Sequence, residues 1–501
     1  MLYPIAPQSP QLPSAHTGDL ADATSRFGLE VELAAEVLDQ LRAVTAIRTD
    51  IEAVGDGGRD WWSPAALWAG DGVVPARAGA VASPTSVDEV SAVLRICHAA
   101  GVPVTPVAGR SGVLGGSITL YGGVALDLCQ MSGIVSVDRE SQLVEVLAGT
   151  WGDKFESAMQ SEFDLTVGHW PQSIALSTVG GWVACRGAGQ MSTRYGKIED
   201  MVSGMEVVLA DGTIIRTGDQ PRQAVGPDFS QLFIGSEGTL GVITSVSLRA
   251  HRRPIAQRQA AYGFTSFGDA LSAMREIVQR GATPAVLRLY DHWESMQQLG
   301  CDGQTHALLV LDEGEQGLID WTMSVVEQCC AAGRPLDESL VDSWMGHRNR
   351  IPDLQKLGSQ GYVWDTMEVT GSWAELDEMY TKTVAAMSAV EHALVVSAHQ
   401  SHSYLDGGCI YFTFAGKPPT ELREEFYRSM WDVGARTVLE AGGSLSHHHG
   451  IGLHRGYLMD TALGSTMGVF RSIKAALDPS GILNPGKMGL DSPFGPRAWT
   501  R

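Results

Sequence analysis

The order of apolar and polar residues changes along the chain from one helical stretch to short apolar runs separated by glycines. Over residues 28–45 the apolar positions recur at helical spacing, which predicts one helix. From about residue 74, short β-rich runs alternate with turns and with a helix over 87–100. The strands predicted in this part are 80–83, 102–107, 123–128, 134–137, 143–148, 202–209, 214–217 and 242–248. The segment Ala210-Asp211-Gly212-Thr213 between two of them predicts a hairpin turn.

A second pattern begins around residue 254, where longer helical stretches alternate with strands. The helices predicted here are 268–280, 317–332, 374–390 and 420–440, and the strands are 285–289, 307–311 and 408–415. This pattern favours a second domain with an antiparallel sheet. We therefore expect an α+β chain, divided into an N-terminal helical segment (1–73), a first domain (74–253), a second domain (254–455) and a C-terminal segment that returns to the first domain (456–501).

Composition and charge narrow the range of partners. The 501 residues include 57 Asp and Glu against 36 Lys and Arg, which gives a formal net charge of −21. Such acidity opposes nonspecific attraction to nucleic acid, so we expect no nucleic-acid partner. With 44% hydrophobic residues the chain can bury a large core. Its 58 glycines are the unusual feature of the composition, and the loops in which they cluster indicate the function.

Cysteine usage and hydropathy bear on the compartment. The seven cysteines form no C-x-x-C pair and no metal-binding spacing, which is typical of reduced, cytosolic thiols. No run of 18 apolar residues occurs, and the first residues lack a basic region followed by an apolar core. We therefore expect a cytoplasmic protein without a signal peptide or transmembrane span.

The first glycine-rich loop, residues 106–112, follows the predicted strand 102–107. Such a loop can turn several backbone N–H groups inward and bind pyrophosphate oxygens without any positive net charge, which an acidic protein needs. The loop is not a G-x-G-x-x-G motif that opens a helix, so a Rossmann site is not supported. A plain turn is the alternative interpretation of this loop alone.

Two further glycine-containing loops, 177–181 and 235–241, strengthen the interpretation of the first loop as a binding site. Together with loop 106–112, the segment 195–200 and the terminal Asn484-Pro485-Gly486-Lys487, they resemble the FAD-binding fold of the vanillyl-alcohol oxidase and p-cresol methylhydroxylase superfamily over about residues 75–490. The resemblance implies FAD as cofactor, a two-subdomain FAD-binding domain and an α+β cap domain over the isoalloxazine. The cofactor-binding residues that it implies are Pro106, Val107, Ala108, Gly109, Arg110, Ser111, Gly112, Gln172, Ser173, Ser177, Thr178, Cys185, Arg186, Gly187, Ala188, Gly235, Ser236, Glu237, Gly238, Thr239, Leu240 and Gly241.

The run of three histidines within residues 446–450 is the most informative motif of the second half. On an extended segment successive side chains alternate, so His447 and His449 would converge while His448 faces away. Imidazole is a common ligand of zinc and iron, which makes a metal site one interpretation. A metal needs three or four converging groups, and the upstream segment 399–402 adds only one pair. We predict no bound metal, and a solvated loop is the other interpretation.

Within the superfamily, three histidines followed by Gly-x-Gly are similar to the alkyldihydroxyacetonephosphate synthases, whereas metal-dependent 2-hydroxyacid dehydrogenases carry Glu-His-Gly at this point. The strand 286–291 and the segment 404–412 resemble the same synthase family. The site residues that this resemblance implies are the acid/base Tyr404, the active-site histidines His447, His448 and His449, the essential Arg288, and a phosphate-binding arginine near Arg348 or Arg350.

A tyrosine with its ordinary pKa of about 10 is a poor base, and a nearby imidazolium would favour the phenolate. An arginine beside the substrate can pair with a phosphate or a carboxylate. Each has a structural alternative, an ion pair for Arg288 and a core position for Tyr404.

The resemblance implies ether-lipid synthesis. An adduct at flavin N5 would let a long-chain alcohol replace the acyl group of acyl-dihydroxyacetone phosphate. The alternative is an FAD-dependent oxidase or dehydrogenase of a 2-hydroxy acid or alcohol. The expected partners are a lipid-like or hydroxy-acid small molecule, transient contact with a membrane surface, and a second copy in a homodimer.

Overall fold

The computed structural model describes residues 2–12, 23–28, 30–69, 71–218, 220–350 and 354–500, and the side chains of 354–356 are not described. Residues 13–22 of the predicted N-terminal segment therefore lie outside the described residues. In the described ranges no helix is long and apolar enough to span a membrane.

The two larger sheets of the N-terminal half have four and five strands. The four-stranded sheet has the order β2 (Ala46–Arg48), β4 (Ala80–Ser83), β6 (Val124–Asp127), β5 (Val104–Val107), and its last three strands are parallel. The five-stranded sheet is antiparallel, with the order β11 (Ile214–Gly218), β10 (Val202–Val208), β12 (Val242–Arg249), β8 (Leu143–Leu147), β7 (Ile134–Asp138). The expected hairpin joins β10 and β11, since Val208 pairs with Ile214. Short strand pairs are β1 (Thr24–Ser25) with β3 (Val73–Val74) and β9 (Leu165–Thr166) with β13 (His251–Arg252).

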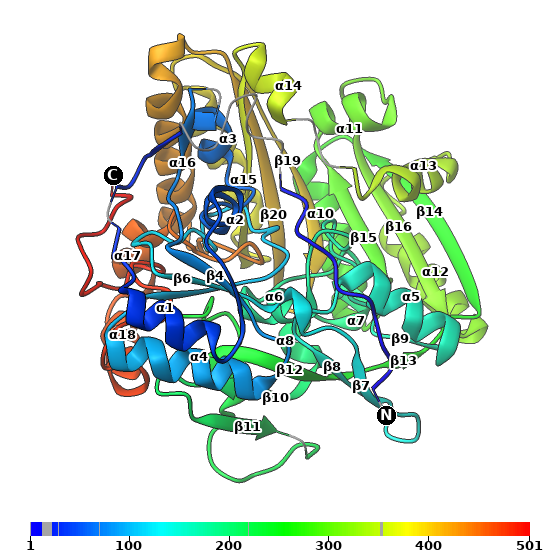
Figure 1. Cartoon of the computed structure of the whole chain (residues 1–501). Helices are drawn as coiled ribbons and strands as arrows, with labels where there is room; N and C mark the ends of the chain where they lie inside the picture. Colours follow the sequence, from blue (N-terminus) through cyan, green and yellow to red (C-terminus); the bar gives the residue numbers. More distant parts are fainter. Residues whose placement is uncertain are drawn as a thin grey trace.

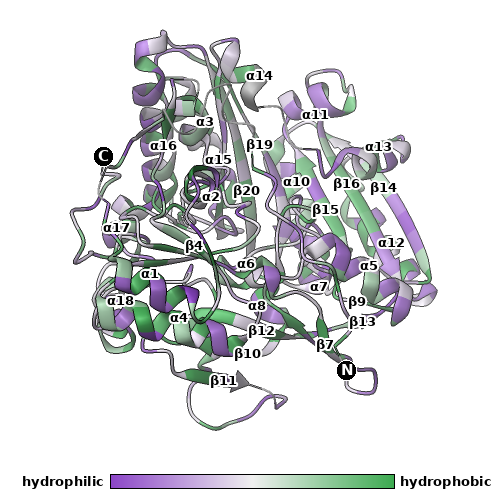
Figure 2. Cartoon of the chain, in the orientation of Figure 1, coloured by the Kyte–Doolittle hydropathy of each residue, from purple (hydrophilic) through white to green (hydrophobic). Residues whose placement is uncertain are grey.

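The helices of this half are mostly short. They are α1 (Ala35–Arg42), α2 (Ile51–Gly57), α3 (Ser63–Ala69), α4 (Val87–Ala100), α5 (Gly152–Glu162), α6 (Val179–Ala184), α7 (Ser192–Tyr195), α8 (Ile198–Met201) and α9 (Ser230–Phe233). Helix α4 begins where Ser86 accepts a hydrogen bond from the Glu89 N–H and ends at Gly101, which adopts a left-handed φ of 65°. Helices α1 and α4 mix hydrophilic and hydrophobic residues, as expected at a surface (Figure 2).

Helix α1 is shorter than the predicted 28–45. Val31 instead forms a parallel bridge with Gly122, and its N–H donates to the carbonyl of Tyr121 at 2.9 Å. Some of the apolar residues before position 35 therefore lie in extended chain, which the helical spacing of the sequence could not reveal.

The second half is built on one seven-stranded antiparallel sheet, as the pattern after residue 254 predicts (Figure 1). Its order is β17 (Arg334–Leu336), β14 (Ala256–Phe264), β16 (His306–Gly314), β15 (Val286–Tyr290), β19 (Ala393–Ser403), β20 (Gly407–Gly416), β18 (Val363–Ser372). The helices are α10 (Phe267–Gln279), α11 (His292–Leu299), α12 (Gln316–Cys329), α13 (Ser339–His347), α14 (Leu354–Ser359), α15 (Leu376–Ser388) and α16 (Arg423–Glu440), followed by α17 (Met459–Leu463) and α18 (Thr466–Leu477).

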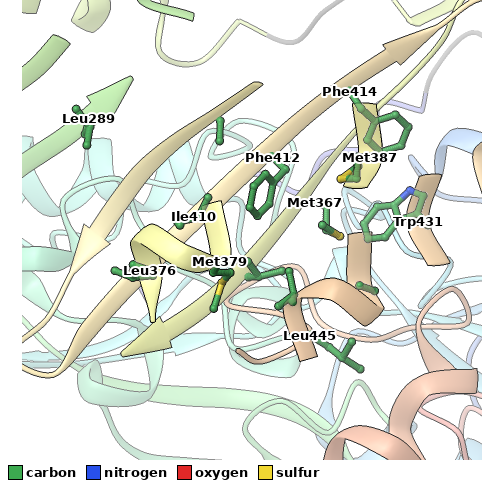
Figure 3. Packing of buried hydrophobic residues seen from close by; sticks show 14 of the residues in the cluster. Leu289, Met367, Leu376, Met379, Met387, Ile410, Phe412, Phe414, Trp431 and Leu445 are labelled. Atoms are coloured by element: carbon green, nitrogen blue, oxygen red, sulfur yellow. The ribbon is translucent and has the colours of Figure 1, made fainter. Parts of the chain in front are cut away.

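The largest hydrophobic core lies between this sheet and the helices α10, α12, α15 and α16. Figure 3 shows Ile410, Phe412 and Phe414 of β20 facing Met379 of α15 and Trp431 of α16. Because side chains alternate along a strand, the residues of β20 between these three point to the opposite face of the sheet. That opposite face contacts helix α7 through β15 and β19, and it carries the candidate site.

Candidate active site

A cavity of about 820 Å³ is lined by loops of the first half and by β15, β18, β19 and β20 of the second. Most of the residues expected to bind the cofactor line it. They are Pro106, Val107, Ala108, Gly109, Arg110, Ser111, Gly112, Gln172, Ser173, Ser177, Thr178, Cys185, Gly187, Ala188, Glu237, Gly238 and Gly241. Loops that are far apart in the sequence therefore share one cavity.

Five predicted cofactor residues do not line this cavity, namely Arg186, Gly235, Ser236, Thr239 and Leu240. Arg186 donates to the carbonyl of Ile234 and to the side chain of Gln231, and it faces Glu199. The Thr239 hydroxyl donates to the carbonyl of Ser236 inside the loop, and Leu240 packs in a hydrophobic core. Cofactor contact by these five residues stays a prediction.

The loops fit a cofactor with a pyrophosphate. A Cβ at Gly109 would lie 2.5 Å from the carbonyl oxygen of Leu176, so loops 106–112 and 172–178 approach each other closely only because this position is glycine. Thr178 lines the cavity, and its hydroxyl is buried and has no hydrogen-bond partner among the described residues. A buried hydroxyl without a partner is costly, and a ligand oxygen in the cavity would satisfy it.

Arg110 is already engaged by the protein. Its guanidinium donates to the carbonyl of Asp56 at 2.8 Å and pairs with the Asp127 carboxylate at 3.1 Å. The charge of Arg110 is therefore neutralised by Asp127, and the backbone amides of the loop are the groups that could bind a phosphate.

The histidine run is folded around one buried carboxylate, that of Glu368 on β18. The backbone N–H groups of His447, His448 and His449 all donate to Glu368 Oε1, at 3.2, 3.2 and 2.8 Å. Arg455 forms a buried ion pair with the same carboxylate. Although burial opposes it, this guanidinium and His449 hold the pKa of Glu368 well below its usual range.

This curled backbone overturns the expected alternation of the histidines. Residues 447–449 form bends and are not a strand, because their three N–H groups turn toward a single acceptor. His448 and His449 line the cavity, whereas His447 lies behind them. The prediction that His448 faces away was wrong.

A chain of hydrogen bonds connects the candidate acid/base to the cavity. The Tyr404 phenol lies 3.0 Å from His447 Nε2 and 3.2 Å from the Ser192 hydroxyl. Ser192 in turn lies 2.7 Å from His402 Nδ1, and His447 Nδ1 lies 2.9 Å from His448 Nδ1. Both ends of the chain, His402 and His448, line the cavity, while Tyr404 does not, so proton exchange with Tyr404 would run through the histidines.

Burial decides the protonation of this chain. Burial and neighbouring positive groups lower the pKa values of His402, His447 and His448 well below the usual range. Burial also raises the pKa of Tyr404 well above its ordinary value, against the opposing hydrogen bond from Ser192. These directions favour neutral imidazoles at His402, His447 and His448 and a protonated Tyr404. They do not support the expected imidazolium beside a tyrosine phenolate.

One ligand atom from each of His402, His447 and His448 lies within 4.8 Å of the others. The same three side chains take part in the hydrogen-bonded chain with Ser192 and Tyr404, which accounts for their approach without an ion. The absence of a metal stays a prediction.

The three predicted substrate arginines also line the cavity. Arg288 of β15 bonds to the Tyr290 hydroxyl at 2.7 Å and to His399 Nε2 at 2.8 Å, and its guanidinium lies over the Trp344 ring. Arg348, which follows α13, donates to the Gln190 side chain at 2.9 Å. Neither guanidinium forms an ion pair in the described part of the chain, and Arg350 offers its carbonyl to Gln172.

Several residues of the site were missed by sequence reasoning. Glu368, Ser192, Glu294 and Arg455 lie in segments without a recognisable motif, so nothing in the sequence marked them. His399 and His402 were noticed only as a pair. Three residues apart, they would point to opposite faces of a regular strand, but the register of β19 shifts between Ser401 and Ser403, with a φ of 58° at His402, and both histidines line the cavity.

The fold and the cavity are those of a flavin-dependent enzyme. Residues 78–218 match a model of the FAD binding domain, and residues 253–488 match the C-terminal domain of FAD linked oxidases. The structure resembles a solved alkyldihydroxyacetonephosphate synthase (TM-score 0.77, 22% identity, 97% of this chain and 90% of that one). It also resembles p-cresol methylhydroxylase (TM-score 0.72, 17% identity, 96% and 99%). The predicted p-cresol methylhydroxylase-type fold is thus confirmed.

Sequence relatives agree with the fold. The FAD-linked oxidoreductase YgcU of Escherichia coli strain K12 is 32% identical over 425 residues, covering 80% of this chain and 87% of that protein. Alkyldihydroxyacetonephosphate synthase of Dictyostelium discoideum is 27% identical over 447 residues (81% and 72%). Glycolate oxidase subunit GlcD of Bacillus subtilis is 26% identical over 424 residues (82% and 88%). The chain belongs to the family of FAD-linked oxidoreductases, and its cofactor is FAD.

Proposed function

We propose that this flavoenzyme acts on a small substrate with an anionic group, and that it replaces the acyl group of acyl-dihydroxyacetone phosphate with a long-chain alcohol. The observation that carries the proposal is the position of Arg288 and Arg348, which line the same cavity as the FAD loops without a carboxylate partner in the described ranges. An unpaired guanidinium at a cavity wall favours a phosphate or carboxylate ligand. The likeness to the alkyldihydroxyacetonephosphate synthases supports phosphate.

The exchange needs proton transfer but no net oxidation. The bond from C1 to the acyl oxygen breaks and a fatty acid leaves, while the alcohol oxygen loses its proton and bonds to C1. Bound FAD would supply an isoalloxazine ring able to act as a nucleophile or to accept hydride. The protein supplies the cavity-facing imidazoles of His402 and His448, which are neutral and can accept the alcohol proton.

The second candidate is the oxidation of a 2-hydroxy acid or alcohol. The same neutral imidazoles can take a hydroxyl proton while hydride leaves the adjacent carbon, and Arg288 would then hold the substrate carboxylate. The relationship to YgcU and to glycolate oxidase subunit GlcD favours this chemistry.

Anaerobic stopped-flow spectroscopy separates the two. If the enzyme exchanges acyl for alkyl groups, acyl-dihydroxyacetone phosphate and hexadecanol should give ether product without an electron acceptor. Bleaching of the flavin band by lactate or glycolate, with electrons passing to a dye and no ether product, would contradict the exchange and support oxidation.

A further inference from the structure

We propose that Glu294 and His399 act as a positioning pair that fixes the tautomer of His399 and so holds Arg288 at the cavity wall as an unneutralised anion-binding group. This inference deepens the proposed function and rests on its anionic substrate. Glu294 and His399 themselves are assigned as positioning residues, because they act through Arg288.

The tautomer follows from donor and acceptor rules. An arginine has only donors, so the 2.8 Å contact between Arg288 Nη2 and His399 Nε2 requires a lone pair on Nε2. The proton of the neutral ring is then on Nδ1, which lies 2.9 Å from Glu294 Oε2 and donates to it. The order of the chain is therefore carboxylate, neutral imidazole, guanidinium.

Glu294 is fixed on every side. Its other oxygen, Oε1, accepts hydrogen bonds from Thr413 at 2.9 Å and from Ser397 at 3.3 Å. Its backbone N–H donates to Asp291 Oδ1 at 2.8 Å, while Asp291 Oδ2 accepts from the N–H of Ala398 at 2.7 Å. The residue that caps helix α11 thus also ties this helix to β19, next to His399.

This arrangement leaves the positive charge of Arg288 available. The guanidinium bonds to two neutral groups, His399 and the Tyr290 hydroxyl, and the carboxylate of Glu294 is held away from it by the width of an imidazole ring. A direct pair with Glu294 would have neutralised Arg288 and weakened its attraction for a ligand. The imidazole of His399 between them orients Arg288 without a direct contact between the guanidinium and the Glu294 carboxylate.

The test is the isosteric change Glu294→Gln in the FAD-loaded enzyme. Thr413 and Ser397 donate to the amide oxygen and hold it on their side, so the new NH₂ group faces His399 Nδ1. Because this NH₂ group is a donor, the ring proton of His399 moves to Nε2. The Nε2–H group then faces an N–H donor of Arg288, and the hydrogen bond between them is lost. Inorganic phosphate and oxalate are titrated separately by their effect on the flavin absorbance. We expect affinity for the preferred anion to fall about 10- to 100-fold, as for a lost charged hydrogen bond.

Matched variants distinguish a loss of Arg288 orientation from a loss of folding. Glu327→Gln, on the exposed face of α12, should leave anion affinity unchanged. His399→Gln can still accept from Arg288 and donate to Glu294, so it should retain more affinity than His399→Leu. The histidine ¹⁵N signal that disappears in both His399 variants belongs to His399. In the wild type, its chemical shifts should be those of a ring protonated at Nδ1.

The outcomes distinguish the two levels of the proposal. If the wild type binds neither anion, the anion site and the proposed function both fail. If the wild type binds an anion and Glu294→Gln binds it equally well, or if His399→Gln and His399→Leu lose affinity equally, only the positioning pair is refuted. Tighter binding of phosphate than of oxalate supports the exchange, and the reverse supports hydroxy-acid oxidation.

Discussion

The phenol oxygen of Tyr404 lies 3.0 Å from Nε2 of His447, and His447 is buried while Tyr404 is half-buried. Burial favours a neutral imidazole and a protonated phenol, so this hydrogen bond joins two neutral groups, and the tautomer of His447 decides which of them donates. Ser192 and His402 extend the contact on one side and His448 on the other, so the pair is the centre of a chain that can pass a proton between two histidines at the cavity.

Tyr404→Phe removes the central hydroxyl of this chain. We expect turnover to fall by about 10²- to 10⁴-fold, the usual contribution of general acid–base catalysis, with FAD still bound. Turnover and flavin content per chain are measured together. The control is Tyr362→Phe, which lies outside the cavity beside Lys417. Wild-type turnover in Tyr404→Phe would remove this residue from the mechanism.

Glu368→Gln removes the charge around which the histidine run folds. The variant leaves Arg455 buried without its carboxylate partner, which costs about 3–5 kcal/mol of unfolding free energy for a broken buried pair. Urea unfolding of the FAD-loaded enzyme measures the loss. Glu440→Gln, at the exposed end of α16, is the matched control and should change stability little. Equal stability of the two variants would contradict the assigned role of Glu368.

The depressed pKa of Glu368 also predicts acid sensitivity. Its folded-state pKa lies below the unfolded value of about 4.3, so the unfolded chain binds the proton first as pH falls. The stability from this group is present above about pH 4.3 and is lost as the pH falls through the folded-state pKa. Unfolding free energy measured from pH 6 to pH 3 should therefore fall less steeply in Glu368→Gln than in the wild type. Parallel curves would argue against this origin.

Thr178→Val tests the cofactor site. The substitution keeps the shape of a side chain that belongs to the cavity lining but removes its buried hydroxyl, which has no described partner. We expect FAD to bind about tenfold more weakly, as for one lost hydrogen bond. Thr119→Val is the control, because its hydroxyl is equally buried and unpartnered but does not line the cavity. Equal FAD affinity in both variants would exclude a contact to Thr178.

Chelation tests the prediction that the histidine cluster holds no metal. Since His402, His447 and His448 already share hydrogen bonds with Ser192 and Tyr404, we expect dialysis against EDTA to leave turnover unchanged. Elemental analysis of the dialysed enzyme confirms that metal has been removed. Loss of turnover that zinc or manganese restores would show a metal site at these residues.

Much of the fold could be predicted because its signals are local. The helices α10, α12, α15 and α16 and the strands β15, β16 and β20 follow from apolar spacing within one segment at a time, whereas β14, β17, β18 and β19 of the same antiparallel sheet were not predicted. The same spacing failed for residues 30–34, where Val31 pairs with a distant glycine and helix α1 begins only at Ala35. Pairing between residues that are far apart in the sequence produces no periodic pattern of apolar residues.

The sequence by itself determined which chemical groups are present and which cofactor they suit. The glycine-rich loops, the histidine run, Tyr404 and Arg288 are visible as motifs because backbone conformation and side-chain chemistry are properties of short segments. Only the tertiary structure decided how these groups ionise and face each other. Glu368 turns the histidines, burial keeps Tyr404 protonated, and Glu294 orients Arg288 through His399. A pKa and a tautomer depend on neighbours brought together from distant strands, and no single segment contains that information.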